Sequence, residues 1–99
     1  MNGTLPFEVQ QTTRFERELK KLIRAHPKAT DEYEAILPIL GTDPYNRTRR
    51  YPIKKLEGVR PGDGQYRIRM RRFRFRYDIQ DQIVSLKSCS LRREDSYRS

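Results

Sequence analysis

The sequence contains one cysteine, Cys89, and one histidine, His26. A single cysteine excludes an internal disulfide, and the two residues cannot supply the several His and Cys ligands of a zinc site. A bound metal ion would therefore need carboxylates alone. We expect neither a metal nor another cofactor.

Long apolar runs are also missing. The longest covers residues 35–40 and includes Pro38, whereas a helix that spans a bilayer needs about 20 apolar residues. The opening residues MNGTLPF lack the basic segment and apolar stretch of an export signal. We therefore expect a cytoplasmic protein that does not cross a membrane.

Apolar residues make up only 34% of the 99 residues, and charged residues make up 35%. A chain of this length has room for one small core, so we expect a single domain over residues 1–99. Lys and Arg number 22 against 13 Asp and Glu, which gives a net charge of +9. This excess predicts a polyanionic partner: an acidic protein, a nucleic acid or a membrane surface.

The positive charge is concentrated in residues 47–76, which hold twelve basic and two acidic side chains. The rest of the chain is close to neutral, so we expect the functional surface in this segment.

Hydrophobic periodicity predicts an α+β fold in which two N-terminal helices pack on a mainly antiparallel sheet of four to five strands. We expect a strand over 5–10 and then a helix from a capping box at Thr13 to His26. A second helix runs from a capping box at Asp31 to Gly41, and Pro38 kinks or shortens it. Further strands are expected over 53–56, 66–71, 72–79 and 83–89.

The strands over 66–71 and 72–79 form a predicted hairpin with one apolar and one basic face. Six arginines share the basic face: Arg67, Arg69, Arg71, Arg72, Arg74 and Arg76. Like charges opposite each other on neighbouring strands are destabilising by up to about 1 kcal/mol per pair, so solubility alone does not explain them. Either this is a solvated face whose long side chains cover apolar surface, or it binds phosphates, which suit the planar guanidinium.

Four segments carry a family resemblance: IKKLEG at 53–58, QYRIRM at 65–70, FRFRYDI at 73–79 and LRREDSYR at 91–98. Together with the order of the elements, they resemble the RelE/ParE toxin superfamily over nearly the whole chain. The resemblance implies a RelE-like fold and a type II toxin, usually an endoribonuclease that cleaves mRNA in the ribosomal A site. It also implies a cognate antitoxin, which we expect to be acidic.

The resemblance assigns the site residues one by one. Catalytic basic residues fall on Arg67, Arg69 and Arg74, the active-site arginine falls on Arg92 with Arg93 as the alternative, and the tyrosine falls on Tyr97. Lys54 and Lys55 border the RNA site, and we add Arg71, Arg72, Arg76 and Arg93 as RNA-binding residues. Many relatives have a histidine where this chain has Leu91, which removes the simplest general acid or base.

RNA supplies its own nucleophile, the 2′-OH, so metal-independent cleavage needs alignment, proton transfer and charge stabilisation. Two alternatives stay open: a ParE-like inhibitor of DNA gyrase, and a non-catalytic nucleic-acid-binding module. We expect His26 to be a C-terminal helix cap or a solvated residue and Cys89 to be a small buried residue, with no catalytic role for either.

Overall fold

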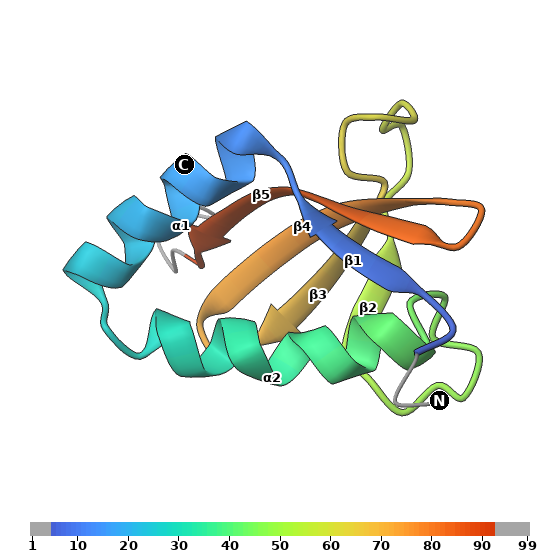
Figure 1. The fold of residues 1–99 in the computed structure, drawn as a ribbon, viewed down its shortest axis with the longest axis horizontal. Helices are drawn as coiled ribbons and strands as arrows, with labels where there is room; N and C mark the ends of the chain where they lie inside the picture. Colours follow the sequence, from blue (N-terminus) through green and yellow to red (C-terminus); the bar gives the residue numbers. More distant parts are fainter. Residues whose placement is uncertain (1–4, 93–99) are drawn as a thin grey trace.

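The computed structural model describes residues 5–92 (Figure 1). Its elements follow the predicted order of one strand, two helices and four strands. They are β1 (Glu8–Gln11), α1 (Thr13–Ala25), α2 (Ala29–Thr42), β2 (Ile53–Lys55), β3 (Tyr66–Met70), β4 (Phe73–Gln80) and β5 (Ile83–Leu91). The α+β class and the mainly antiparallel sheet are confirmed.

The strands form one sheet in the order β1-β5-β4-β3-β2. The pairs β2–β3, β3–β4 and β4–β5 are antiparallel, and β1 pairs in parallel with residues 83–86 of β5. The first strand thus lies beside the last, and the two helices lie between β1 and β2 in the chain. A hairpin loop of two residues joins β3 to β4, and another joins β4 to β5.

The N-cap of helix α1 lies one residue before the N-cap that the sequence pattern predicts. Thr12, rather than Thr13, is the N-cap, and its hydroxyl accepts a hydrogen bond from the backbone N–H of Phe15. The same hydroxyl donates to the carbonyl of Leu86 at 2.8 Å, so the cap also attaches the helix to β5. His26 ends the helix as its C-cap, as expected.

Helix α2 begins at Ala29, two residues before the predicted start at Asp31, and Lys28 caps it without a side-chain hydrogen bond. Pro38 does not end the helix, which continues to Thr42, where the hydroxyl donates to the carbonyl of Pro38. An interior proline removes one helical hydrogen bond. The fully buried Ile36 and Leu40 on either side hold this stretch against the core, which offsets that loss.

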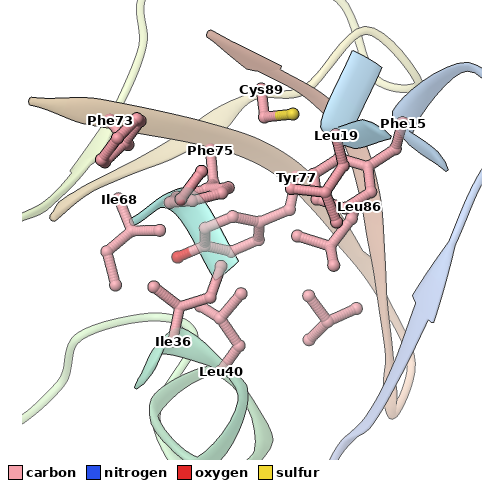
Figure 2. Close-up of a cluster of buried hydrophobic side chains, with 12 residues drawn as sticks. Phe15, Leu19, Ile36, Leu40, Ile68, Phe73, Phe75, Tyr77, Leu86 and Cys89 are labelled. Atoms are coloured by element: carbon pink, nitrogen blue, oxygen red, sulfur yellow. The ribbon is translucent and has the colours of Figure 1, made fainter. Parts of the chain in front are cut away.

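The core lies between the two helices and one face of the sheet (Figure 2). Tyr77 of β4 is fully buried among side chains from β5 and α2, and its hydroxyl donates to the carbonyl of Pro44 at 2.7 Å. Residues Ile68, Phe75 and Leu86 are also fully buried on this face. Side chains alternate along the strands, apart from an irregularity in β5 where the pairing skips Lys87, so the other strand residues lie on the opposite face of the sheet.

Neither helix in the described part of the chain is long and apolar enough to span a membrane.

Candidate nucleic-acid interface

The sheet face opposite the helices carries four arginines, Arg67 and Arg69 from β3 and Arg74 and Arg76 from β4, which we call the arginine face. The strand register pairs Arg67 with Arg76 and Arg69 with Arg74. Directly opposed residues on neighbouring strands have Cβ atoms about 4.5–5.5 Å apart. The register therefore places two opposed pairs of like charge side by side on one hairpin.

These arginines are half-buried, and the Nε atoms of Arg67 and Arg74 are shielded from solvent. Their stems pack along the sheet while the charged ends stay near water, as long basic side chains commonly do. Partial burial lowers the effective dielectric constant around a charge, so an anion bound here would be held more strongly than on an open surface.

The two cross-strand pairs of the arginine face continue as rows of paired residues on the neighbouring strands. Lys54 of β2 pairs with Arg67, and on β5 Ser88 pairs with Arg76 and Ser90 pairs with Arg74. The two serines add hydroxyl groups beside the guanidinium stems, and residue assignment by family resemblance missed them. Because the two serines flank the buried Cys89, alternation along the strand could have predicted that both lie on the opposite face from it.

Arg92 follows β5, and its backbone N–H donates to the carbonyl of Arg72 at 2.5 Å. Arg92 is one residue beyond the end of β5 and two residues after Ser90, which lies on the arginine face. The exposed Arg92 therefore lies beside the β3–β4 loop, close in the chain to the arginine face. Arg93 and Tyr97 lie outside the described residues.

The side chain of Arg76 makes hydrogen bonds that support a loop beside this face. Its Nε donates to the carbonyl of Gly64 at 3.1 Å, and a terminal nitrogen donates to the carbonyl of Asp63 at 3.0 Å. The carboxylate of Asp78 accepts from the backbone N–H groups of Gly64 and Gln65, both at 2.9 Å. These two β4 side chains hold the 58–64 loop against the sheet, and the sequence did not indicate this role for Asp78.

The expectation that all six hairpin arginines share one face is wrong for Arg71 and for Arg72, which lies near His26 and Pro27 on the helix side. The hairpin loop consists of Arg71 and Arg72, so the alternation of β3 ends at Met70. Arg71 adopts a positive φ of 58°, and its Nε lies 2.9 Å from a carboxylate oxygen of Glu32 on α2. Its side chain is therefore directed to the helix side, away from the arginine face.

Lys55 also lies on the other side of the sheet from Lys54. It pairs with Tyr66, and its ammonium group lies 5.8 Å from the centre of the Tyr66 ring. Successive strand residues point to opposite faces, so only one of the two neighbouring lysines can join Arg67. The structure brings Lys54 to the arginine face and leaves Lys55 near the edge of the core.

The ionisable groups of the core are structural. Burial raises the pKa of Tyr77 and, to a smaller degree, that of Tyr66. Burial also raises the pKa of the Cys89 thiol to about 12, with a further contribution from the nearby Glu18 carboxylate. These phenols and this thiol are protonated at neutral pH and lie away from the arginine face.

Among residues 5–92, no cluster of three or more His, Cys, Asp or Glu side chains could hold a metal ion. His26 lies at the end of α1 with its ring 6.2 Å from that of Phe73, on the helix side of the sheet. The described arginine face therefore offers cations and hydroxyl groups for binding an anion.

No protein-family model matches this chain, and neither does any curated protein sequence. Among solved structures, a chain of the archaeal RelE–RelB complex from Pyrococcus horikoshii is similar with a TM-score of 0.65 and 22% identity, over 91% of this chain and 99% of that chain. A chain of the toxin–antitoxin complex RelBE2 from Mycobacterium tuberculosis is similar with a TM-score of 0.64 and 23% identity, over 93% and 98% of the two chains. With two helices packed on a five-stranded mixed sheet and these structural neighbours, the chain has the RelE-like fold.

Proposed function

We propose that this protein is the toxin of a type II toxin–antitoxin system and a metal-independent endoribonuclease that cleaves mRNA, in the ribosomal A site. The observation that carries the proposal is the block of Arg67, Arg69 and Arg74 on one sheet face. Arg92 follows β5, two residues after Ser90 of the same face. Guanidinium groups bind phosphate oxygens through paired N–H donors, so such a block fits a nucleic-acid backbone. The RelE-like fold supports the choice of a toxin.

The reaction uses the 2′-OH of the RNA as nucleophile. The 2′-oxygen attacks the adjacent phosphorus, the bond from phosphorus to the 5′-oxygen breaks, and the products are a 2′,3′-cyclic phosphate and a 5′-OH. One proton leaves the 2′-OH and one reaches the 5′-oxygen. Negative charge builds up on the phosphate in the transition state, and cations placed around it lower the barrier.

In this proposal Arg67, Arg69, Arg74 and Arg92 surround the scissile phosphate. They stabilise charge but do not act as bases, because arginine stays protonated at all relevant pH values. Tyr97 stacks on or orients the base at the cleavage position, with proton transfer as its second possible role. Lys54 extends the binding surface along the row of Arg67.

An acidic antitoxin segment is the proposed partner that blocks the toxin. The net charge of +9 and the concentration of arginines on one face favour an acidic chain that competes with RNA. The two similar structures are complexes of a toxin with its antitoxin, which supports the same kind of partner here.

Arg74→Ala tests the proposal directly. We expect cleavage of translated mRNA to fall by about 100- to 1000-fold, the usual effect of removing one donor that stabilises a transition state. Growth arrest should disappear with it. Primer extension on mRNA after induction would show discrete cuts for the unchanged protein and none for the variant.

The matched control is Arg17→Ala, which removes an exposed arginine from α1. It should cut RNA like the unchanged protein. A folded Arg74→Ala variant that remains fully toxic would contradict the assignment. DNA-damage signalling without RNA cuts would indicate gyrase poisoning instead, and RNA binding without cuts would indicate a non-catalytic module.

A further inference from the structure

A hollow of about 260 Å³ lies beside the loop between β3 and β4, on the helix side of the sheet. It is formed where the loop meets the connection between α1 and α2. Its lining consists of Ala25, His26, Pro27, Lys28, Glu32, Arg71, Arg72 and Phe73. Drug-sized ligands occupy pockets of about 300–1,000 Å³, so this hollow suits a smaller group, such as one nucleotide.

The lining combines flat and apolar groups with cations. The rings of Phe73 and His26 lie edge to face with centres 6.2 Å apart, and Pro27 adds an apolar wall. Lys28 and Arg72 are exposed at the rim. Flat rings next to cations match the base and the phosphate of a nucleotide.

Glu32 is the one carboxylate in this lining. The residue is only 9% exposed, and its carboxylate is paired with Arg71, whose side chain is 78% exposed. An ionised carboxylate only accepts hydrogen bonds and has several acceptor positions, so the pair with Arg71 leaves it able to accept more. It can therefore take N–H donors from a base edge.

The hollow is connected to the arginine face by the hairpin loop. Arg71 and Arg72 of this loop line the hollow, and Arg69 and Arg74 of the arginine face lie two residues before and two residues after them in the chain. A single strand that leaves the arginine face past Arg69 and Arg74 would meet the hollow on the other side of this loop.

We propose that the hollow binds a nucleotide flanking the one held on the arginine face, and that Glu32 gives it a preference for guanine. Guanine presents two neighbouring N–H donors, N1–H and N2–H, to one carboxylate, whereas uracil presents a single one. An acidic peptide fits less well, because it would bring carboxylates against Glu32. This inference rests on the proposed function, since it concerns the same RNA strand.

The test uses the full chain and four short single-stranded RNAs that carry 2′-O-methyl groups and therefore cannot be cleaved. They differ only in the flanking base. Fluorescence anisotropy gives the dissociation constants. We expect Lys28→Ala to weaken binding of all four by about three- to tenfold, through loss of one phosphate contact. Glu32→Gln should reduce the guanine preference by about tenfold, the usual size of base discrimination by paired hydrogen bonds.

Lys20→Ala, an exposed change on α1 away from the hollow, is the matched control and should leave all four constants unchanged. Urea unfolding verifies that each variant is folded. If Arg74→Ala weakens binding while Lys28→Ala and Glu32→Gln change nothing, the hollow is not an RNA subsite and the proposed function still stands.

A second readout separates the two proposals from each other. In NMR spectra of the full chain, 5′-GMP should shift the backbone signals of Ala25, Lys28 and Phe73 more than 5′-UMP does. Such shifts support the nucleotide site even if no cleavage is ever found. Equal shifts with both nucleotides, no shifts, or displacement of GMP by a short polyglutamate at lower concentration would overturn it, the last in favour of a peptide site.

Discussion

Arg67 and Ile68 are neighbours on β3, yet they lie in opposite surroundings. Ile68 is fully buried and faces Phe75 across the hairpin, whereas the half-buried Arg67 faces Arg76. The face of Ile68 is stabilised by burial of apolar surface. The face of Arg67 opposes like charges, which cost stability. We infer that packing explains the composition of the first face, and that binding explains that of the second.

The most direct test of this difference between the two faces is to truncate one side chain on each. Phe75→Ala should lower the free energy of unfolding by about 3–5 kcal/mol, the usual cost of removing a buried phenylalanine. Arg69→Ala should change it by less than about 0.5 kcal/mol, because the truncation also removes an opposed like charge. Urea unfolding measures both values.

Activity should show the reverse order. Arg69→Ala should lose most RNA cleavage while it stays folded, in line with the proposed role of this residue. An Arg69→Ala variant that unfolds as readily as Phe75→Ala would mean that the arginine face is held together by its own contacts, and the comparison would fail.

A smaller effect is expected at Asp78, an acidic residue of β4 that supports the 58–64 loop. Asp78→Ala removes two hydrogen bonds to backbone N–H groups at 2.9 Å and should cost about 2 kcal/mol of stability, typical of bonds to a charged group. Asp63→Ala is the matched control. Its carboxylate is 3.9 Å from Arg60 in an exposed pair, so its loss should cost less than about 0.5 kcal/mol.

Proteolysis within the loop gives an independent measure. Asp78→Ala should speed cleavage by the protease Glu-C after Glu57, at the start of the loop, because the loop loses its attachment to β4. Equal proteolysis and equal stability of the two aspartate variants would show that Arg76 alone holds the loop.

The smallest effect concerns the pH dependence of the core. The Cys89 thiol ionises near pH 9.0 in the unfolded chain, and burial raises its pKa to about 12 in the folded protein. Between these values the folded state holds a proton that the unfolded state releases, so stability falls as pH rises from 9 towards 12. Cys89→Ala should flatten that slope in urea unfolding at pH 8, 9 and 10, although buried tyrosines add their own decline above pH 10.

Thiol reactivity checks the same point. Alkylation of Cys89 in the folded protein at pH 8 should be much slower than in urea, since the reactive species is the thiolate. A rate equal to that of the unfolded chain would contradict both the burial and the raised pKa.

The fold was largely predictable because its periodicities are local. The switch from a helical period to a period of two located the hairpin, and the strands predicted over 72–79 and 83–89 lie on either side of the observed loop at residues 81–82. The helix starts were wrong by one or two residues. Neighbouring Thr12 and Thr13 are both good caps, and only Thr12 reaches Leu86 of β5.

The site was less predictable because three of its features depend on contacts between distant residues. Arg71 leaves the arginine face to pair with Glu32, Arg76 turns to the 58–64 loop, and Lys55 lies beside Tyr66. Alternation along a strand predicts on which face of the sheet a side chain lies. It does not predict where the strand ends or which residue a long side chain contacts.

The amino-acid sequence alone determined the order of the elements, the apolar positions that become buried and the placing of positive charge on a hairpin, since these follow from local patterns and composition. Tertiary structure alone decided the register of β2 against β3 and of β3 and β5 against β4. That register brings Arg67, Arg69 and Arg74 onto one surface and forms the hollow behind the loop at Arg72. The physical reason is that register and side-chain partners depend on interactions across the whole chain, which no local pattern contains.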